Sequence, residues 1–266
     1  MLRGRKTMSP RTENLLHRAL IDWRDWQAGD VVLGEEPTVL EQLQGGLTNE
    51  SFLIGSGEFR AVIRVNAANT QSLGIDRDRE RSLLEHLQPT HCVPKLIYSD
   101  SSVQVTQLIR GRHLSQSDLA DTGVQDTLEL CIQRIQAISV SMPTRNYADY
   151  IRLYSDQLTH FEGLADIQQA ANMIDQSQWT PVIAHHDLIL ENLIINEQGV
   201  YFLDWEYADL GHPLIDHIKL FGRTYCEDRY SSPDINALVT LQNGIVKLWY
   251  AVQDERSKNI KLNGNS

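Results

Sequence analysis

The spacing of hydrophobic residues divides the chain into a strand-rich first part and a helical second part. In the first part, short apolar or alternating runs between turns predict about five strands, at 38–44, 50–54, 59–65, 95–99 and 103–109. Apolar residues at helical spacing predict one helix before these strands and one inserted among them, at 13–26 and 74–87. From about residue 115 helical spacing takes over, at 124–138, 147–174 and 232–255.

This order of elements predicts an α+β fold with two lobes. We expect residues 1–110 to form a small amino-terminal lobe, an antiparallel sheet with one inserted helix, in which residues 1–12 are a loose tail. Residues 111–266 are expected to form a larger, mainly helical lobe. Within this lobe, three short apolar runs each end in a cluster of polar residues, at 181–184, 193–196 and 200–203.

Composition and charge narrow the class of protein. The chain has 266 residues, of which 41% are hydrophobic and 22% charged, as in a soluble globular protein. Its formal net charge of −11 repels polyanions, so we expect a cationic small substrate and not nucleic acid. Three cysteines without a CxxC pattern indicate a reducing compartment. Because no apolar run resembles a membrane span or a signal peptide, we expect a cytoplasmic protein without a membrane partner.

Acidic and amide side chains are spaced around one predicted hairpin within residues 185–204. Asp187 and Asn192 lie in the segment DLILEN, and Asp204 follows the apolar run after the hairpin turn. Because a hairpin brings its two ends together, Asn192 and Asp204 are expected to be neighbours. An amide oxygen beside a carboxylate suits Mg²⁺, which leaves Asp187 free to accept a proton or to orient a hydroxyl.

With His185 two residues before Asp187, the spacing matches the H-x-D-x-x-x-x-N loop and metal-binding aspartate of kinase-like phosphotransferases. From about residue 38 to 253 the chain resembles the aminoglycoside phosphotransferase and choline kinase superfamily, which shares the protein-kinase fold. The stretches GGLTN, IRVN, GIDRDRE and DWEYA are most similar to the branch of choline, ethanolamine and thiamine kinases. The resemblance implies an ATP-dependent, Mg²⁺-requiring kinase that phosphorylates a hydroxyl of a small, cationic metabolite such as thiamine, choline or ethanolamine.

A glycine-bearing loop in the first lobe is the expected phosphate-binding segment. Adjacent glycines let backbone N–H groups turn towards phosphate oxygens, and two polar side chains add donors, so we assign to the nucleotide Gly45, Gly46, Thr48 and Asn49. The segment has neither the Walker lysine nor the G-x-G-x-x-G pattern. An ordinary turn is therefore the alternative interpretation.

The resemblance also implies nucleotide contacts from a strand, a helix and the lobe junction. Kinases usually place a lysine on the third strand, and here Arg64 takes that position with Glu80 as its helix partner. For Glu80, a solvated helix face is the alternative. Backbone groups at the lobe junction are expected to contact adenine, around Gln107, Leu108 and Ile109.

Within the second lobe the resemblance implies distinct roles for the motif residues. Asp187 would accept the proton of the attacking hydroxyl or orient that hydroxyl. Asn192 and Asp204 would bind the metal ion and complete the catalytic set. His185 and Asp216 would support the loop without taking part in the chemistry.

Substrate recognition is expected near the segment DWEYAD and the last helix. Aromatic faces and carboxylates hold organic cations, and we assign to the substrate Glu206, Asp209 and Trp249. For Glu206, assistance to a second metal ion and a plain surface position are alternatives. Protein kinases follow the metal-binding aspartate with Phe-Gly, whereas Asp204 is followed by Trp205, so no phenylalanine-driven switch is expected.

Three other functions remain open from the sequence. They are an aminoglycoside-type phosphotransferase, a non-catalytic nucleotide-binding pseudokinase and a metal-dependent phosphohydrolase. The phosphohydrolase would hold a transition metal with the side chains of His185, His186, Asp187, His212, Asp216 and His217. The sequence leaves undetermined the acceptor, the role of His186, the preference for ATP or GTP, and the oligomeric state.

Overall fold

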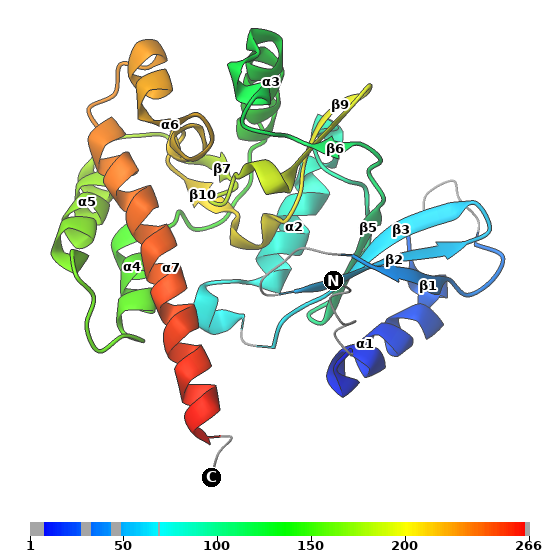
Figure 1. Cartoon of the computed structure of the whole chain (residues 1–266). Helices are drawn as coiled ribbons and strands as arrows, with labels where there is room; N and C mark the ends of the chain where they lie inside the picture. Colours follow the sequence, from blue (N-terminus) through cyan, green and yellow to red (C-terminus); the bar gives the residue numbers. More distant parts are fainter. Residues whose placement is uncertain (1–7, 28–32, 44–48, 69, 264–266) are drawn as a thin grey trace. The chain divides into compact units, whose positions relative to one another are not determined.

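Five strands from the first part of the chain pair into one antiparallel sheet, as the alternating pattern predicts. They are β1 (Thr38–Gln42), β2 (Glu50–Ser56), β3 (Phe59–Val65), β4 (Leu96–Ser99) and β5 (Val103–Gln107), in the order β1-β2-β3-β5-β4. The computed structural model describes residues 8–27, 33–43, 49–68 and 70–263, with side chains up to residue 258. The sheet and helix α1 (Pro10–Ile21) belong to one compact unit, formed by residues 1–68 and 93–111 (Figure 1).

Helix α1 covers the apolar face of this sheet. Leu16 and Leu20 from the helix pack with Phe52 and Ile63 from the strands, and all four side chains are buried. The helix begins at Pro10 because the Ser9 side chain accepts a hydrogen bond from a backbone N–H of the first turn. Residues 10–12 are therefore helical and do not form part of the predicted loose tail.

The second compact unit comprises residues 69–92 and 112–266 and is mainly helical, as predicted. Its longer helices are α2 (Arg77–Leu87), α3 (Thr122–Gln136), α4 (Tyr147–Ser155), α5 (Leu164–Gln176), α6 (Ile215–Arg229) and α7 (Ile235–Asn263). Figure 1 shows α7, coloured orange to red, beside α4 and α5, with which it shares one hydrophobic core. In the described ranges, no helix is long and apolar enough to cross a membrane.

Helix α2 packs with the second unit, although its sequence position suggested an insertion in the first lobe. Its side chains Arg77 and Arg79 form ion pairs with Glu206 and Asp209, which follow the metal-binding aspartate predicted at position 204. Burying an arginine is favourable only with such partners. The helix therefore belongs to the second unit, because its contacts are with residues far away in the chain.

Short strands of the second unit hold the polar segments of the predicted site. β6 (Arg112–His113), β8 (Leu193–Asn196) and β9 (Gly199–Phe202) form a three-stranded sheet, and β7 (Val182–Ala184) pairs with β10 (Asp209–Gly211). The predicted hairpin is present as β8 and β9. Residues 185–192 therefore connect β7 to the hairpin, and residues 203–208 connect the hairpin to β10.

Candidate active site

Asp216 fixes the backbone of the segment that follows β7. This residue lies at the start of α6, is 4% exposed, and accepts the backbone N–H of His185 at 2.7 Å and that of His186 at 2.9 Å. His186 has the left-handed φ of 64°, which turns the chain sharply before Asp187. Burial raises the pKa of Asp216, although the two N–H donors act in the opposite direction. The contacts are those of a residue that positions the loop.

His185 ties the loop to the end of the hairpin. Its Nε2 lies 2.7 Å from the backbone oxygen of Leu203, so this nitrogen carries the proton and donates. Its Nδ1 accepts the backbone N–H of Asp187 at 3.3 Å. The ring also packs against Trp205, with 4.8 Å between ring centroids. Both ring nitrogens are used within the protein, which leaves His185 a supporting role.

The hairpin brings the two predicted metal ligands to neighbouring positions. Leu193 pairs with Phe202 in the β8–β9 ladder, and the backbone N–H of Leu203 donates to the backbone oxygen of Asn192 at 2.8 Å. Asn192 uses its amide nitrogen to donate to the backbone oxygen of Asp187 at 3.0 Å. Its amide oxygen is therefore the atom suited to a cation, and Asp204 stands just after the other hairpin strand.

This donor set fits Mg²⁺, which prefers carboxylate and amide oxygens and keeps several positions for water and phosphate. Asp204 has the left-handed backbone angles φ 59° and ψ 64°, an uncommon conformation for a residue other than glycine. Asn192 and Asp204 are the residues that would hold the ion.

Asp187 forms an ion pair that the sequence analysis missed. The Lys219 ammonium lies 3.5 Å from Asp187 Oδ1, and the two side chains are 14% and 34% exposed. Lys219 is three residues after Asp216, so both lie on the same face of α6. That helical spacing is the signal from which the lysine could have been found.

Aromatic side chains from α4, α7 and the segment after Asp204 belong to the second unit with Asp187. Trp249 donates its indole N–H to the Tyr207 hydroxyl at 2.9 Å. Burial raises the pKa of Tyr150 and that of Tyr207, and the negative charge of Asp187 contributes to both shifts. The predicted substrate residue Trp249 is thus joined to an aromatic group within the electrostatic reach of Asp187.

The two carboxylates predicted to contact substrate have partners within the protein. Glu206 is 2% exposed and lies 3.0 Å from an Arg77 nitrogen. Asp209 is 7% exposed and lies 3.1 Å from Arg79 and 3.5 Å from Arg145. These three arginines were not among the predicted site residues. The structure supplies positioning contacts for both acids, and their contact with substrate stays a prediction.

The predicted nucleotide residues of the first unit are described in part. Arg64 is 8% exposed on β3 and donates from Nε to Asn66 at 3.1 Å, while the amide oxygen of Asn49 accepts the backbone N–H of Ala67 at 3.1 Å. Gly45, Gly46 and Thr48 lie outside the described residues. Their contact with nucleotide stays a prediction.

The remaining nucleotide residues lie in both units. Gln107 ends β5 in the first unit with an exposed side chain, and Ile109 follows with a half-buried one. Glu80 belongs to the second unit, where it is 1% exposed and accepts from Arg77 at 2.8 Å. The solvated helix face considered for Glu80 is therefore absent. Its pairing with Arg64 and the adenine contacts stay predictions.

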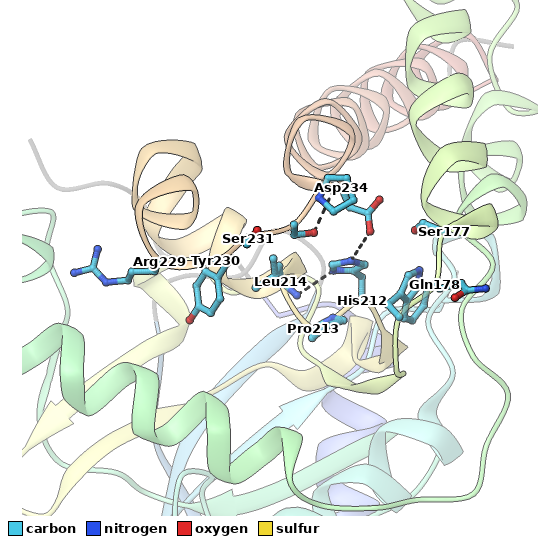
Figure 2. Close-up of a pocket in the computed structure, with 12 residues that line it drawn as sticks. Ser177, Gln178, His212, Pro213, Leu214, Arg229, Tyr230, Ser231 and Asp234 are labelled. Atoms are coloured by element: carbon cyan, nitrogen blue, oxygen red, sulfur yellow. Dashed lines mark hydrogen bonds and ion pairs between the residues drawn. The ribbon is translucent and has the colours of Figure 1, made fainter.

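A separate pocket of about 570 Å³ opens on the second unit (Figure 2). It is lined by residues 177–179, 212–214 and 229–234, and none of the predicted catalytic residues lines it. Figure 2 shows His212 directed towards Asp234, with 3.3 Å between Nε2 and the carboxylate. Because the His212 Nδ1 accepts the Leu214 N–H at 3.1 Å, Nε2 carries the proton. Burial lowers the pKa of His212, so the ring is a neutral donor.

The histidines do not assemble the metal site of a phosphohydrolase. In the part of the chain that the structure describes, no three His, Cys, Asp or Glu side chains are placed to hold one metal ion. His186, whose role the sequence left open, accepts a hydrogen bond at 3.2 Å from the buried Tyr147 hydroxyl. His217 bonds to Glu129 at 3.1 Å. The histidines are thus structural hydrogen-bonding groups.

The profile of the phosphotransferase enzyme family matches residues 39–243, which is more than half of the chain. The chain belongs to this family. Membership explains why one loop and one hairpin carry Asp187, Asn192 and Asp204 together.

Sequence relatives of this phosphotransferase include choline and ethanolamine kinases. It is 27% identical to a LicA homologue of Mycoplasma capricolum, over 64% of its own length and 76% of the relative's. It is 24% identical to probable choline kinase 3 of Arabidopsis thaliana, over 78% and 66% of the two chains. It is 25% identical to human ethanolamine kinase 1, over 75% of this chain and only 50% of the human protein.

Solved structures share the fold of this phosphotransferase. Choline kinase LicA from Streptococcus pneumoniae aligns with a TM-score of 0.66 at 22% identity, covering 82% of this chain and 87% of that one. A LicA complex with AMP gives a TM-score of 0.69 at 23% identity, with 84% and 87% covered. The predicted kinase-like fold is confirmed, and the relatives confirm the predicted enzyme class of small-molecule kinases.

Proposed function

We propose that this phosphotransferase transfers the terminal phosphoryl group of ATP to a hydroxyl of a small cationic alcohol such as choline, ethanolamine or thiamine. The observation that carries the proposal is the placement of Asp187 between His185 and Asn192, with Asp204 at the other end of the hairpin. Choline and ethanolamine appear among the named activities of the relatives, and a related fold binds AMP. Thiamine is included because DWEYA resembles that branch.

The proposed reaction is an in-line displacement. The acceptor hydroxyl oxygen attacks the terminal phosphorus of ATP, the bond to the bridging oxygen breaks, and ADP leaves with that electron pair. Asp187 orients the hydroxyl and takes its proton, which later passes to solvent. Asn192 and Asp204 would hold Mg²⁺, which when bound supplies charge neutralisation for the phosphates.

Aromatic side chains support a cationic acceptor. Tyr207 and Trp249 are half-buried rings of the kind whose faces attract quaternary ammonium or thiazolium groups, whereas the Arg145 guanidinium already lies over the Tyr150 ring, 4.2 Å from its centroid. Arginines already neutralise Asp209 and Glu206, so the aromatic faces carry more of the proposed recognition than those two carboxylates. An aminoglycoside acceptor, which bears several ammonium groups, is tested in the same screen.

The first experiment measures acceptor-dependent ADP release with ATP and Mg²⁺. The acceptors are choline, ethanolamine, thiamine, sugar amines and aminoglycosides. We expect one of the first three to stimulate ADP release most strongly, with formation of its phosphate ester. Release of phosphate from an ester, with no transfer to any alcohol, would instead support a hydrolase.

The Asp187→Asn variant tests the catalytic assignment. Loss of the carboxylate should lower acceptor-stimulated ADP release by about 100-fold or more and leave ATP binding largely unchanged, because the aspartate acts on the hydroxyl. Asp166→Asn, an exposed aspartate on α5, is the matched control and should retain full activity. Undiminished turnover in Asp187→Asn would remove this residue from the mechanism.

A further inference from the structure

Lys219 contacts the catalytic-loop aspartate from the same helical turn that fixes the loop backbone. Asp216 accepts two backbone N–H groups of the loop, and three residues later Lys219 places its ammonium 3.5 Å from Asp187 Oδ1. The first turns of α6 therefore hold both the main chain before Asp187 and the side chain of Asp187. All these contacts lie within the second unit.

The ion pair is partly exposed and is expected to contribute little to folding. A pair whose members are 14% and 34% exposed is worth about 1 kcal/mol or less, since water screens it and the two side chains lose rotamer freedom. Catalysis is more sensitive than stability to such a contact, because a misplacement of about 1 Å can cost roughly 100-fold in rate. Loss of Lys219 is therefore expected to lower kcat more than it lowers the free energy of unfolding.

The catalytic loop provides no cation of its own for this purpose. Between Asp187 and Asn192 the residues are Leu-Ile-Leu-Glu, three apolar side chains and one acid. The backbone N–H and C=O of Asp187 are both used, by His185 and Asn192. These contacts fix the main chain of Asp187 and leave rotation of its carboxylate to be fixed by another group. Lys219 contacts that carboxylate.

We propose that Lys219 is the positioning residue for Asp187: its ammonium engages one carboxylate oxygen so that the other faces the acceptor hydroxyl. This inference rests on the proposed function. The acceptor hydroxyl would approach the Oδ2 side of Asp187, and the proton would move to that oxygen. Lys219 itself does not bind the acceptor and takes no part in the proton transfer.

The test compares Lys219→Met and Lys219→Arg with the wild-type enzyme. Methionine keeps much of the length of the side chain and removes its charge, whereas arginine keeps the charge. We expect Lys219→Met to lower kcat about 10- to 100-fold with the KM for ATP changed less than about twofold, and Lys219→Arg to recover most of that loss. Lys258→Met, at a lysine 70% exposed on α7, is the control and should behave as wild type.

A double variant separates positioning from a direct effect on the reaction. If Lys219 acts through Asp187, adding Lys219→Met to Asp187→Asn should change the residual rate by less than about twofold. Losses that multiply in the double variant would overturn the proposal, and so would an unchanged kcat in Lys219→Met.

Thermal unfolding of the same proteins separates positioning from a structural role. We expect the Tm of Lys219→Met to stay within about 3 °C of wild type, as for loss of a partly exposed ion pair. A larger fall that accounts for the lost activity would overturn the proposal. Absence of transfer to any alcohol by the wild-type enzyme would instead refute the proposed function, which is a different outcome from an active enzyme indifferent to Lys219.

Discussion

Gly211 leaves room for the buried groups His186 and Tyr147 beside the catalytic loop. A Cβ atom at this position would lie 2.5 Å from His186 Nε2 and 2.7 Å from the Tyr147 hydroxyl. That hydroxyl donates to His186 and accepts the backbone N–H of His212 at 2.9 Å. Burial, with a contribution from the nearby Arg145, keeps the pKa of His186 well below its usual value, so the ring is neutral and can accept.

We therefore expect Gly211→Ala to destabilise the protein by about 1–3 kcal/mol, because the new methyl group must displace two buried polar groups. Urea unfolding measures this change. Gly34→Ala is the control, since a Cβ there would meet nothing within 4 Å. Equal stability of Gly211→Ala and wild type would show that the hydrogen-bonded pair moves without cost.

The neighbouring positions of residues at a fixed spacing were predictable from the sequence, and their roles stay predictions. The interval from Asp187 to Asn192 and the hairpin length to Asp204 are visible in the chain itself. Lys219 shares a helix face with Asp216, which is a signal in the sequence, but its contact with Asp187 and that of Arg145 with Asp209 depend on the packing of segments far apart in the chain. Tertiary contact, and not residue type, decides which lysine or arginine belongs to the site.

At the scale of elements, α2 is joined to the segment after Asp204 by a buried chain of charges. Arg77 lies 2.8 Å from Glu80 and 3.0 Å from Glu206, and all three side chains are at most 7% exposed. Trp205 and Glu206 replace the Phe-Gly of protein kinases, and Glu206 connects this segment to α2. The absence of a phenylalanine-driven switch stays a prediction.

Arg77→Met should lower the free energy of unfolding by about 3 kcal/mol or more, because two buried carboxylates lose a counter-ion. Combining it with Glu206→Gln should recover part of that loss, since one of the buried charges is then removed. Chemical denaturation provides the measurement. Arg81→Met on the same helix is the control, since its pair with Asp78 is exposed and its loss should cost about 0.5 kcal/mol or less. A double variant less stable than Arg77→Met would contradict this account.

Helices α3 and α6 are joined by a carboxylate that accepts from three side chains. Glu129 on α3 receives hydrogen bonds from His217, Tyr225 and Tyr230 at 2.9–3.1 Å. Burial acts to raise the pKa of Glu129, but these donors outweigh it and the net pKa lies below the ordinary value.

The lowered pKa gives Glu129 a contribution to stability that depends on pH. Because the folded state holds the ionised form more strongly than the unfolded state does, this contribution is complete above the ordinary pKa of about 4.5 and is lost as pH falls through the lower folded value. Glu129→Gln should cost about 1–3 kcal/mol at neutral pH and flatten the acid side of a stability-versus-pH curve. An unchanged acid dependence would exclude this role.

Across the whole molecule, the order of elements followed from periodicity, whereas their grouping did not. The five strands and the hairpin were predicted because short apolar or alternating runs between turns mark them in the sequence, even in β1, where Val39 and Leu40 are exposed. Helix α2 was assigned to the first lobe because it lies between strands of that lobe in the sequence. The buried arginines of α2 determine which unit the helix packs against. Their counter-ions could not be located from the sequence, because the charge of a residue does not show which acid it will meet.

The acceptor could not be predicted for the same reason. The side chains considered for the acceptor come from α7 and the segment after Asp204, and Lys219 of α6 contacts Asp187. No single stretch of sequence contains all of these side chains. The shape of the acceptor site therefore depends on how the complete second unit packs.

The placement of α2 also has a consequence for synthesis on the ribosome. The segment 69–92 emerges before most of the second unit exists, and Arg77 meets Glu206 only after the hairpin strands have been made. Until then its charged side chains stay hydrated and the helix has few tertiary contacts to hold it, since an isolated helix of this length is marginal in water. The nascent second unit is therefore completed late, and its exposed apolar surface at that stage is a natural target for chaperones.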